Sequence, residues 1–125
     1  MKYSQKVMNY FLNPKNMGAL KNPDGVGRVG NPTCGDIMEV QISVGKNKKG
    51  EEIIKDIKFQ TFGCGAAIAT SSILTEIAKN KTLKESQKIS MKEISEELGG
   101  LPKIKTHCAG LATQALKKAI ENYKK

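Results

Sequence analysis

The stretch that decides the fold is residues 37–62, IMEVQISVGKNKKGEEIIKDIKFQTF. Apolar and polar side chains alternate in residues 37–44, and one face of this predicted strand carries Met38, Val40, Ile42 and Val44. A turn over residues 46–50 leads to a second strand, residues 52–62, whose inward side chains include Ile57 and Phe59. The pattern predicts an antiparallel hairpin with one buried side, extended by part of the chain that precedes it.

Upstream of the hairpin, residues 13–36 are rich in residues that interrupt helices and strands. These are Pro14, Gly18, Pro23, Gly25, Gly27, Gly30, Pro32 and Gly35. They predict a long mobile loop, and loops of this length are usually functional. Residues 25–30 match the G-x-G-x-x-G pattern of dinucleotide sites, but Asn31-Pro32 follows and no strand is predicted before it. We therefore interpret these glycines as a source of flexibility for the loop.

Helical patterns account for most of the remaining chain. Residues 3–12 predict a short amphipathic helix with Val7, Met8, Tyr10 and Phe11 on one face. Residues 66–79 predict a second helix with an inner stripe of Ala66, Ala69, Ile73, Leu74 and Ile77. Residues 82–98 predict one or two short helices with Thr82 and Ser90 as N-caps, Ser90 forming a capping box with Glu93. A final helix over residues 106–123 would bury Ala112, Ala115, Leu116, Ala119 and Ile120.

Strands followed by helices predict an α+β fold. We expect a small antiparallel sheet of about three strands with the helices packed on one face. The length of 125 residues fits one compact domain, residues 1–125, that can bury enough surface to fold without a metal or disulfide.

The composition narrows the cellular setting. No apolar run approaches 18 residues, and the N-terminus lacks the apolar stretch of a secretory signal, so we expect a cytoplasmic protein without a membrane span. In that reducing compartment the three cysteines should be thiols.

The net charge of +9 fits a soluble, lysine-rich surface, and docking to acidic proteins fits it as well. Nucleic-acid binding is a weaker alternative, because the lysines are scattered, Arg28 is the only arginine and no aromatic–basic motif occurs. We therefore expect no nucleic-acid partner.

Each cysteine lies at a junction between predicted elements. Cys34 precedes the first predicted strand, Cys64 lies between a strand and a helix, and Cys108 lies in the first turn of the last helix. A helix N-terminus favours the thiolate, which is the form that binds soft metals and attacks sulfur.

Polar residues accompany the cysteines. Asp36 is two residues after Cys34, and Lys105 and His107 precede Cys108. Three thiolates with an Asp or His as fourth ligand suit zinc or an iron–sulfur cluster. The sequence separations between the cysteines, 30 (34 to 64) and 44 (64 to 108), are not those of a zinc finger. On spacing alone, three ordinary buried cysteines remain an alternative, and His107 can equally be a surface or packing histidine.

Four stretches resemble the U-type iron–sulfur cluster scaffolds, meaning IscU and the amino-terminal domain of NifU. The first is YSQKV (3–7) with NPKNMG (13–18), and the second is GNPTCGD (30–36). The third is FGCGAAIATSS (62–72), and the fourth is LPKIKTHC (101–108). The motifs occur in the same order as in the family and cover nearly the whole chain, which argues against cysteines kept only for packing.

The resemblance implies a SufE/NifU-like fold and a scaffold that is not a conventional enzyme. It implies that Cys34, Cys64 and Cys108 ligate a [2Fe–2S] cluster, with Asp36 or His107 as an exchangeable fourth ligand. Sulfur would arrive as persulfide from a cysteine desulfurase, with Cys108 as the acceptor and Lys105 assisting.

The partners implied are the desulfurase, an electron donor such as a ferredoxin, and the apo iron–sulfur proteins that receive the cluster. A homodimer is also compatible with the resemblance. Zinc can occupy the same ligands when iron is absent, and a zinc-bound sulfur acceptor for the desulfurase is the main alternative. A thiol enzyme using His107 and Cys108 is disfavoured, because adjacent residues at a helix start point in different directions.

Two departures from the family bear on these expectations. The chaperone-recognition pentapeptide of the family is commonly Leu-Pro-Pro-Val-Lys, whereas residues 101–105 are LPKIK, which weakens the expectation of chaperone docking. Only 43 residues separate Cys64 from Cys108, without the insertion of the zinc-dependent SufU proteins. This spacing favours the scaffold over the zinc-bound type.

Overall fold

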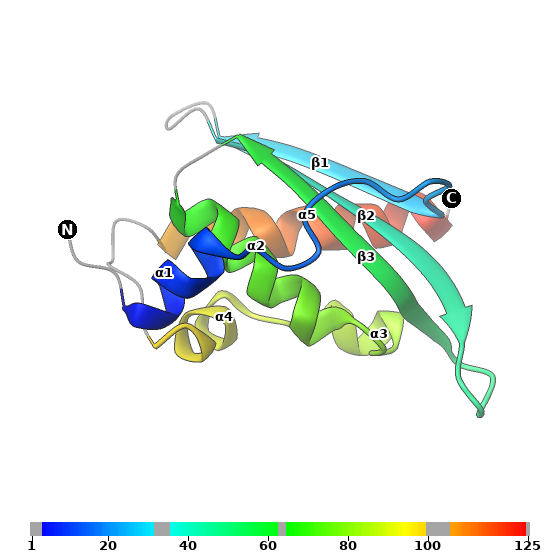
Figure 1. Ribbon diagram of the computed structural model, residues 1–125. Coiled ribbons are helices and arrows are strands. Elements are labelled where there is room, and N and C mark those ends of the chain that lie inside the picture. The colour runs from blue at the N-terminus through cyan, green and yellow to red at the C-terminus, as the bar shows by residue number, and fades with distance from the viewer. Residues whose placement is uncertain (1–3, 32–35, 63–64, 100–105, 125) are drawn as a thin grey trace.

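The computed structural model describes residues 4–31, 36–62, 65–99 and 106–124 (Figure 1). Its strands are β1 (Gly25–Asn31), β2 (Asp36–Lys46) and β3 (Glu52–Phe62). Its helices are α1 (Gln5–Leu12), α2 (Gly65–Ala78), α3 (Leu83–Ser86), α4 (Met91–Glu97) and α5 (Thr106–Lys124). The predicted hairpin and helices are therefore present, with ends that differ from the predicted ones by no more than a few residues.

The three strands form one antiparallel sheet in the order β1-β2-β3. The register of β2 on β3 pairs Val40 with Phe59 and Ile42 with Ile57. All four of these side chains are fully buried, which confirms the predicted inner face of the hairpin. An irregularity at Ser43/Val44 shifts the register near the turn, and Val44 packs only at the margin of the core.

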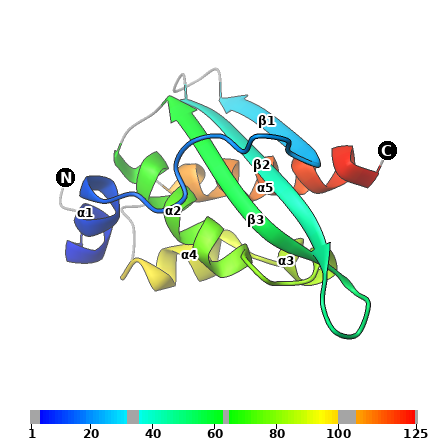
Figure 2. The same cartoon turned by 45° about the vertical axis from the view of Figure 1, so that its right-hand side comes forward.

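The helices cover one face of this sheet, as the α+β prediction requires (Figures 1 and 2). α5 packs along β1 and β2, while α2 packs against β3 and α5. Because α2 is enclosed on several sides, even its polar residues Thr70, Ser71, Ser72 and Thr75 are buried. The predicted inner residues of α5 are all buried: Ala112, Ala115, Leu116, Ala119 and Ile120.

The prediction that residues 25–30 belong to a mobile loop is wrong, because they form strand β1. The glycines serve close packing. A Cβ atom on Gly27 would lie 2.2 Å from the carbonyl oxygen of Ala115 in α5, and one on Gly25 would lie 2.3 Å from that of Ala119. No side chain fits between backbones this close, so glycine is required by the approach of α5 and not for flexibility.

Residues 13–24 are also held in place rather than loose. The N–H of Gly18 donates to the carbonyl of Phe59, and the N–H of Phe59 donates to the carbonyl of Asn16, so this segment covers the free edge of β3. The N–H of Leu20 then donates to the side chain of Gln41, which lies on the face of the sheet away from the core residues Val40 and Ile42. The segment therefore crosses the open face of the sheet from β3 toward β1 (Figure 1).

Hydrogen-bonding side chains define the starts of three helices. Ser4 accepts the N–H of Val7 at α1, and Ser90 accepts the N–H of Glu93 at α4. A complete capping box was predicted at Ser90, but it is found at the start of α3. There the N–H of Thr82 donates to the Glu85 carboxylate and the N–H of Glu85 donates to the Thr82 hydroxyl, both over 3.0 Å. Among the helices described, none combines the length and apolar character needed to cross a membrane.

Candidate functional site

Three strand ends come together at one end of the molecule. Asn31, the last residue of β1, pairs with Asp36, the first residue of β2. Ile37 pairs in turn with Phe62, the last residue of β3. Hydrogen-bonded strands lie about 4.8 Å apart, so the three ends form a compact row.

The starts of two helices lie at the same end. α2 begins at Gly65 and α5 at Thr106, and both views place these helix starts near the row of strand ends (Figures 1 and 2). The buried residues Ala66, Ala67 and Ala109 belong to the first turns of the two helices. Small side chains at these positions allow the two helices to approach closely.

The predicted ligands belong to these elements or to the segments next to them in the sequence, and none of their side chains is among those that the structure describes. Cys34, Cys64 and Lys105 belong to segments that the structure does not describe. Asp36 is the first residue of β2, and His107 and Cys108 lie in the first turn of α5, as predicted for Cys108. The side chains of these three residues are not described. The ligand set itself therefore remains a prediction. Within the described residues there is no group of three or more His, Cys, Asp or Glu placed to hold a metal.

A hollow of about 390 Å³ lies on the open face of the sheet beside Phe62. Phe62 is 75% exposed, directly before Gly63-Cys64 in the chain. The hollow is lined by Met17, Gly18, Arg28, Ile37, Glu39, Gln60, Thr61 and Phe62. An exposed aromatic side chain thus lies at the end of β3 on this face.

A second cavity, of about 280 Å³, lies where α1 meets the start of α2. Its described lining is Val7, Met8, Phe11 and Gly65. The apolar face predicted for α1 is only partly covered: Val7 is 1% exposed, whereas Met8 and Phe11 are 37% and 40% exposed. Sequence reasoning did not identify this cavity, because it depends on how α1 is placed on α2.

Two contacts hold α1 in that place. Burial, followed by a hydrogen bond to Glu76 of α2, raises the pKa of Tyr10 to about 12. At the other end of α1, the hydroxyl of Ser4 donates to the carbonyl of Leu98, just beyond α4, over 2.5 Å. α1 is therefore fixed against two other helices, and its exposed apolar residues are held beside the start of α2.

The family model of the NifU-like N terminal domain matches residues 2–125. The chain belongs to this family. Its membership confirms the resemblance drawn from the four sequence motifs, which are distributed over the same range.

Curated relatives are similar over nearly the whole chain. The "Iron-sulfur cluster assembly scaffold protein IscU 1" of Archaeoglobus fulgidus is 55% identical over 121 residues, covering 97% of this chain and 76% of that protein. The protein named "Iron-sulfur cluster assembly scaffold protein IscU" in Escherichia coli is 49% identical over 127 residues, covering 99% and 95%.

Solved structures agree with the fold. A NifU-like protein (N-terminal) from Brucella abortus superposes with a TM-score of 0.71 at 18% identity, covering 97% of this chain and 93% of that one. At this identity the likeness concerns the fold alone.

Proposed function

We propose that this protein is a scaffold on which a [2Fe–2S] cluster is assembled from iron and persulfide sulfur and then transferred to apo-proteins. Membership of the NifU-like family, with relatives named as assembly scaffolds, supports this function. The observation that carries it is the meeting of three strand ends and two helix starts at one end of the fold.

Chain connectivity relates this meeting point to the proposed ligands. Cys64 is covalently joined to Gly65, and Cys108 is the third residue of α5. Cys34 is two residues from Asp36, and consecutive Cα atoms are about 3.8 Å apart. The three cysteines are separated by 30 and 44 positions in the sequence (34 to 64, and 64 to 108). Each is nevertheless in, or covalently close to, one of the strand ends or helix starts that meet at this end of the fold. Three thiolates at one site would suit the iron of a sulfide cluster.

The fourth position would be taken by Asp36 or His107. A carboxylate is a harder ligand than a thiolate and binds the iron of a sulfide cluster less strongly. A site with one oxygen or nitrogen ligand should therefore release its cargo more readily than a cage of four thiolates. Release is what a scaffold requires, because the cluster is its cargo and not its resident cofactor.

Sulfur delivery requires a donor and electrons. A cysteine desulfurase would pass persulfide sulfur to Cys108, with the charge of Lys105 assisting. Sulfane sulfur must be reduced to sulfide before it can bridge iron, so an electron donor such as a ferredoxin is also needed. These partners, and a cytoplasmic location, belong to the proposal.

Anaerobic reconstitution tests the proposed function. The purified chain is incubated with ferrous iron, cysteine and a cysteine desulfurase, and its visible absorption is followed. A scaffold should develop the charge-transfer bands of a [2Fe–2S] cluster, and after an apo-ferredoxin is added and the two proteins are separated, the bands should be found in the ferredoxin fraction. Cys34→Ala, Cys64→Ala and Cys108→Ala should each prevent stable assembly. A colourless protein that retains zinc and accepts only persulfide would establish the alternative function instead.

A further inference from the structure

A polar hollow of about 670 Å³ lies at the end of the hairpin that carries its turn. Its walls are the turn with the start of β3, the chain around α3, and the end of α5. Two of these walls are joined by backbone hydrogen bonds: the N–H of Ile54 donates to the carbonyl of Lys81 over 2.9 Å, and the N–H of Asn80 donates to that of Ile54 over 2.8 Å. Four lysines line this hairpin hollow: Lys49, Lys84, Lys88 and Lys124.

The hairpin hollow also contains three glutamates, and hydrogen bonds within the fold hold each of their carboxylates. The amide Nδ2 of Asn47 donates to Glu51 over 3.1 Å, the N–H of Thr82 donates to Glu85 over 3.0 Å, and the hydroxyl of Tyr123 donates to Glu52. The positions of these carboxylates are therefore fixed by contacts on the wall of the hollow.

The four lysines differ from the glutamates in this respect. The ion pairs among the described residues are Lys79–Asp56 and Lys92–Glu96, and neither includes a lysine of the hollow. All four lysine side chains are exposed. Lys46 and Lys48 adjoin lining residues in the chain, so further positive charge lies nearby. The hairpin hollow thus presents ammonium groups from three parts of the fold to solvent.

These groups suit carboxylates on a protein better than the phosphates of a nucleic acid. The described lining contains no aromatic side chain on which a base could stack and no arginine for bidentate contacts to phosphate. The fixed carboxylates of Glu51 and Glu52 would repel a continuous row of phosphates. A protein segment presents its carboxylates at separate points, so that they can meet the lysines individually.

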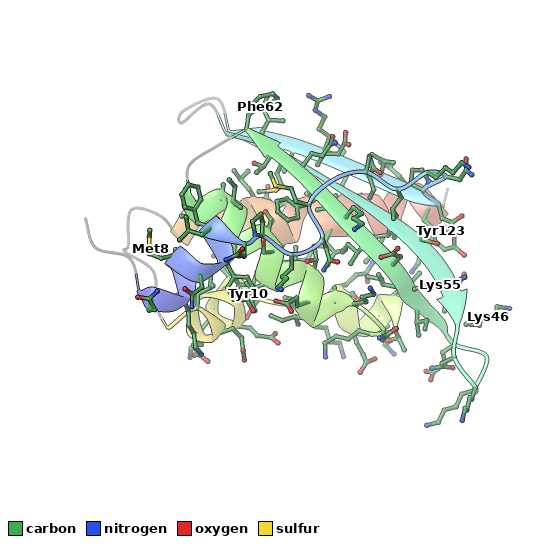
Figure 3. All side chains as sticks on the ribbon, viewed as in Figure 1. Met8, Tyr10, Lys46, Lys55, Phe62 and Tyr123 are labelled. Atoms are coloured by element: carbon green, nitrogen blue, oxygen red, sulfur yellow. The ribbon has the colours of Figure 1, made fainter. Side chains whose placement is uncertain are left out.

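We propose that the hairpin hollow docks a carboxylate-rich segment of a partner protein. The hollow and the candidate cluster site lie at opposite ends of the hairpin, as the positions of Lys46 and Phe62 show (Figure 3). β2 joins these ends through 11 residues, which corresponds to roughly 33 Å of extended strand. A partner bound in the hollow would therefore leave the row of strand ends and helix starts accessible. The inference goes beyond the proposed function, because this docking does not require a cluster.

The test measures the fluorescence anisotropy of a labelled decaglutamate peptide as metal-free protein is added. The peptide should bind at about 50 mM salt and more weakly at about 300 mM, because salt screens exposed charges. Charge reversal at two lysines of the hollow, Lys84→Glu with Lys88→Glu, should weaken binding by about tenfold or more.

The matched control is Lys117→Glu with Lys118→Glu. It changes the net charge equally, but at two exposed lysines of α5 that do not line the hollow. The control should change the affinity by less than about threefold. A second pair, Lys49→Glu with Lys124→Glu, alters the other two walls and decides the question if the first pair does not fold.

Equal weakening by the hollow and control variants would overturn the inference, since it would show attraction to the overall charge of the protein. Absence of peptide binding to the wild type would overturn it as well. A decauridylate that binds as tightly as the peptide, with the same loss in Lys84→Glu with Lys88→Glu, would establish a nucleic-acid site instead. Because all these measurements use metal-free protein, their outcome is independent of whether the chain assembles a cluster.

Discussion

At the scale of single residues, the absence of a side chain determines how β1 and α5 pack. Gly25 and Gly27 lie on the face of β1 that α5 covers, and the helix backbone comes within 2.2–2.3 Å of where their Cβ atoms would be. Gly45, in β2, is different: a Cβ atom there would lie 3.3 Å from the side chain of Lys55, which can move aside. Glycine is therefore required for packing at positions 25 and 27 of β1, but not at position 45 of β2.

Gly27→Ala should destabilise the fold by about 2–3 kcal/mol, because the new methyl group must push α5 away from the sheet. Gly45→Ala is the matched control, and its free energy of unfolding should change by no more than about 0.5 kcal/mol. Urea denaturation followed by circular dichroism measures both. Equal stabilities of the two variants would show that α5 can shift without loss of packing.

Asp36 is the residue at which cluster release can be tested. Replacing its carboxylate with the methyl group of alanine should lengthen the lifetime of the reconstituted cluster and slow its transfer to apo-ferredoxin, because a labile oxygen ligand is removed. Asp24→Ala serves as a control, since Asp24 lies before β1 and accepts the N–H of Val44 through its side chain. Transfer that is equal or faster in Asp36→Ala would contradict the proposed role of Asp36.

At the scale of whole elements, polar contacts fix the short helices and the sheet edge. α3 has only four residues, too few for a stable helix by itself, and its start is closed by the reciprocal bonds of Thr82 and Glu85. Residues 16–18 pair with Phe59 and cover part of the β3 edge, which would otherwise present unpaired backbone groups. Hydrogen bonds thus complete both the short helix α3 and the edge of the sheet.

The contribution of Glu85 should depend on pH. The backbone N–H of Thr82, followed by its side chain, lowers the pKa of Glu85 from its ordinary value of 4.5. A carboxyl group with a lowered pKa in the folded state stabilises the fold above its unfolded pKa, and this stabilisation disappears as the pH falls through the folded pKa. Glu85→Ala should therefore lower the melting temperature at pH 7 and have less effect near pH 3.

The control is Glu93→Ala, at the equivalent position of α4. Ser90 accepts the N–H of Glu93, but the described contacts include no bond from the backbone N–H of Ser90 to the Glu93 carboxylate. Glu93→Ala should therefore lower the melting temperature at pH 7 by less than Glu85→Ala does. Thermal melts of both variants across the pH range would show this difference, and an effect of Glu85→Ala that is the same at pH 3 and pH 7 would contradict the assignment.

At the scale of the whole molecule, one apolar core joins the sheet to the helices. Phe59 of β3, Leu74 of α2 and Ile120 of α5 belong to the same buried cluster. The core reaches α1 through Val7 and α4 through Ile94, so almost every element contributes to it. Removing any one layer would expose the others.

Residues 1–125 should accordingly unfold as one cooperative unit. Far-UV circular dichroism and tyrosine fluorescence should report the same midpoint in urea, because the tyrosines lie in α1 and α5 as well as near the N-terminus. The metal-free protein is the sample to use, since bound metal would add a second equilibrium. Two separated transitions would contradict the single-domain prediction.

The alternating hairpin shows what local pattern can predict. β3 occupies residues 52–62 as expected, and the inner residues of α5 are those chosen from helical periodicity. Part of the chain before the hairpin was expected to extend the sheet, but residues 25–30 were assigned to a loop, because Gly25, Gly27 and Gly30 leave too few apolar side chains to alternate. The course of residues 13–24 was missed for a related reason, since its hydrogen bonds go to partners distant in the sequence.

By itself, the amino-acid sequence determined the α+β class, the family and the three cysteines at element junctions, because periodicity, turn residues and motif order are local properties of the chain. Only the tertiary structure decided that glycines 25 and 27 serve the approach of α5 and that Phe11 packs against Gly65. It also brought the ends of β1, β2 and β3 together with the starts of α2 and α5. The physical reason is that these contacts join residues far apart in the chain, whose distances are set by the packing of one shared core.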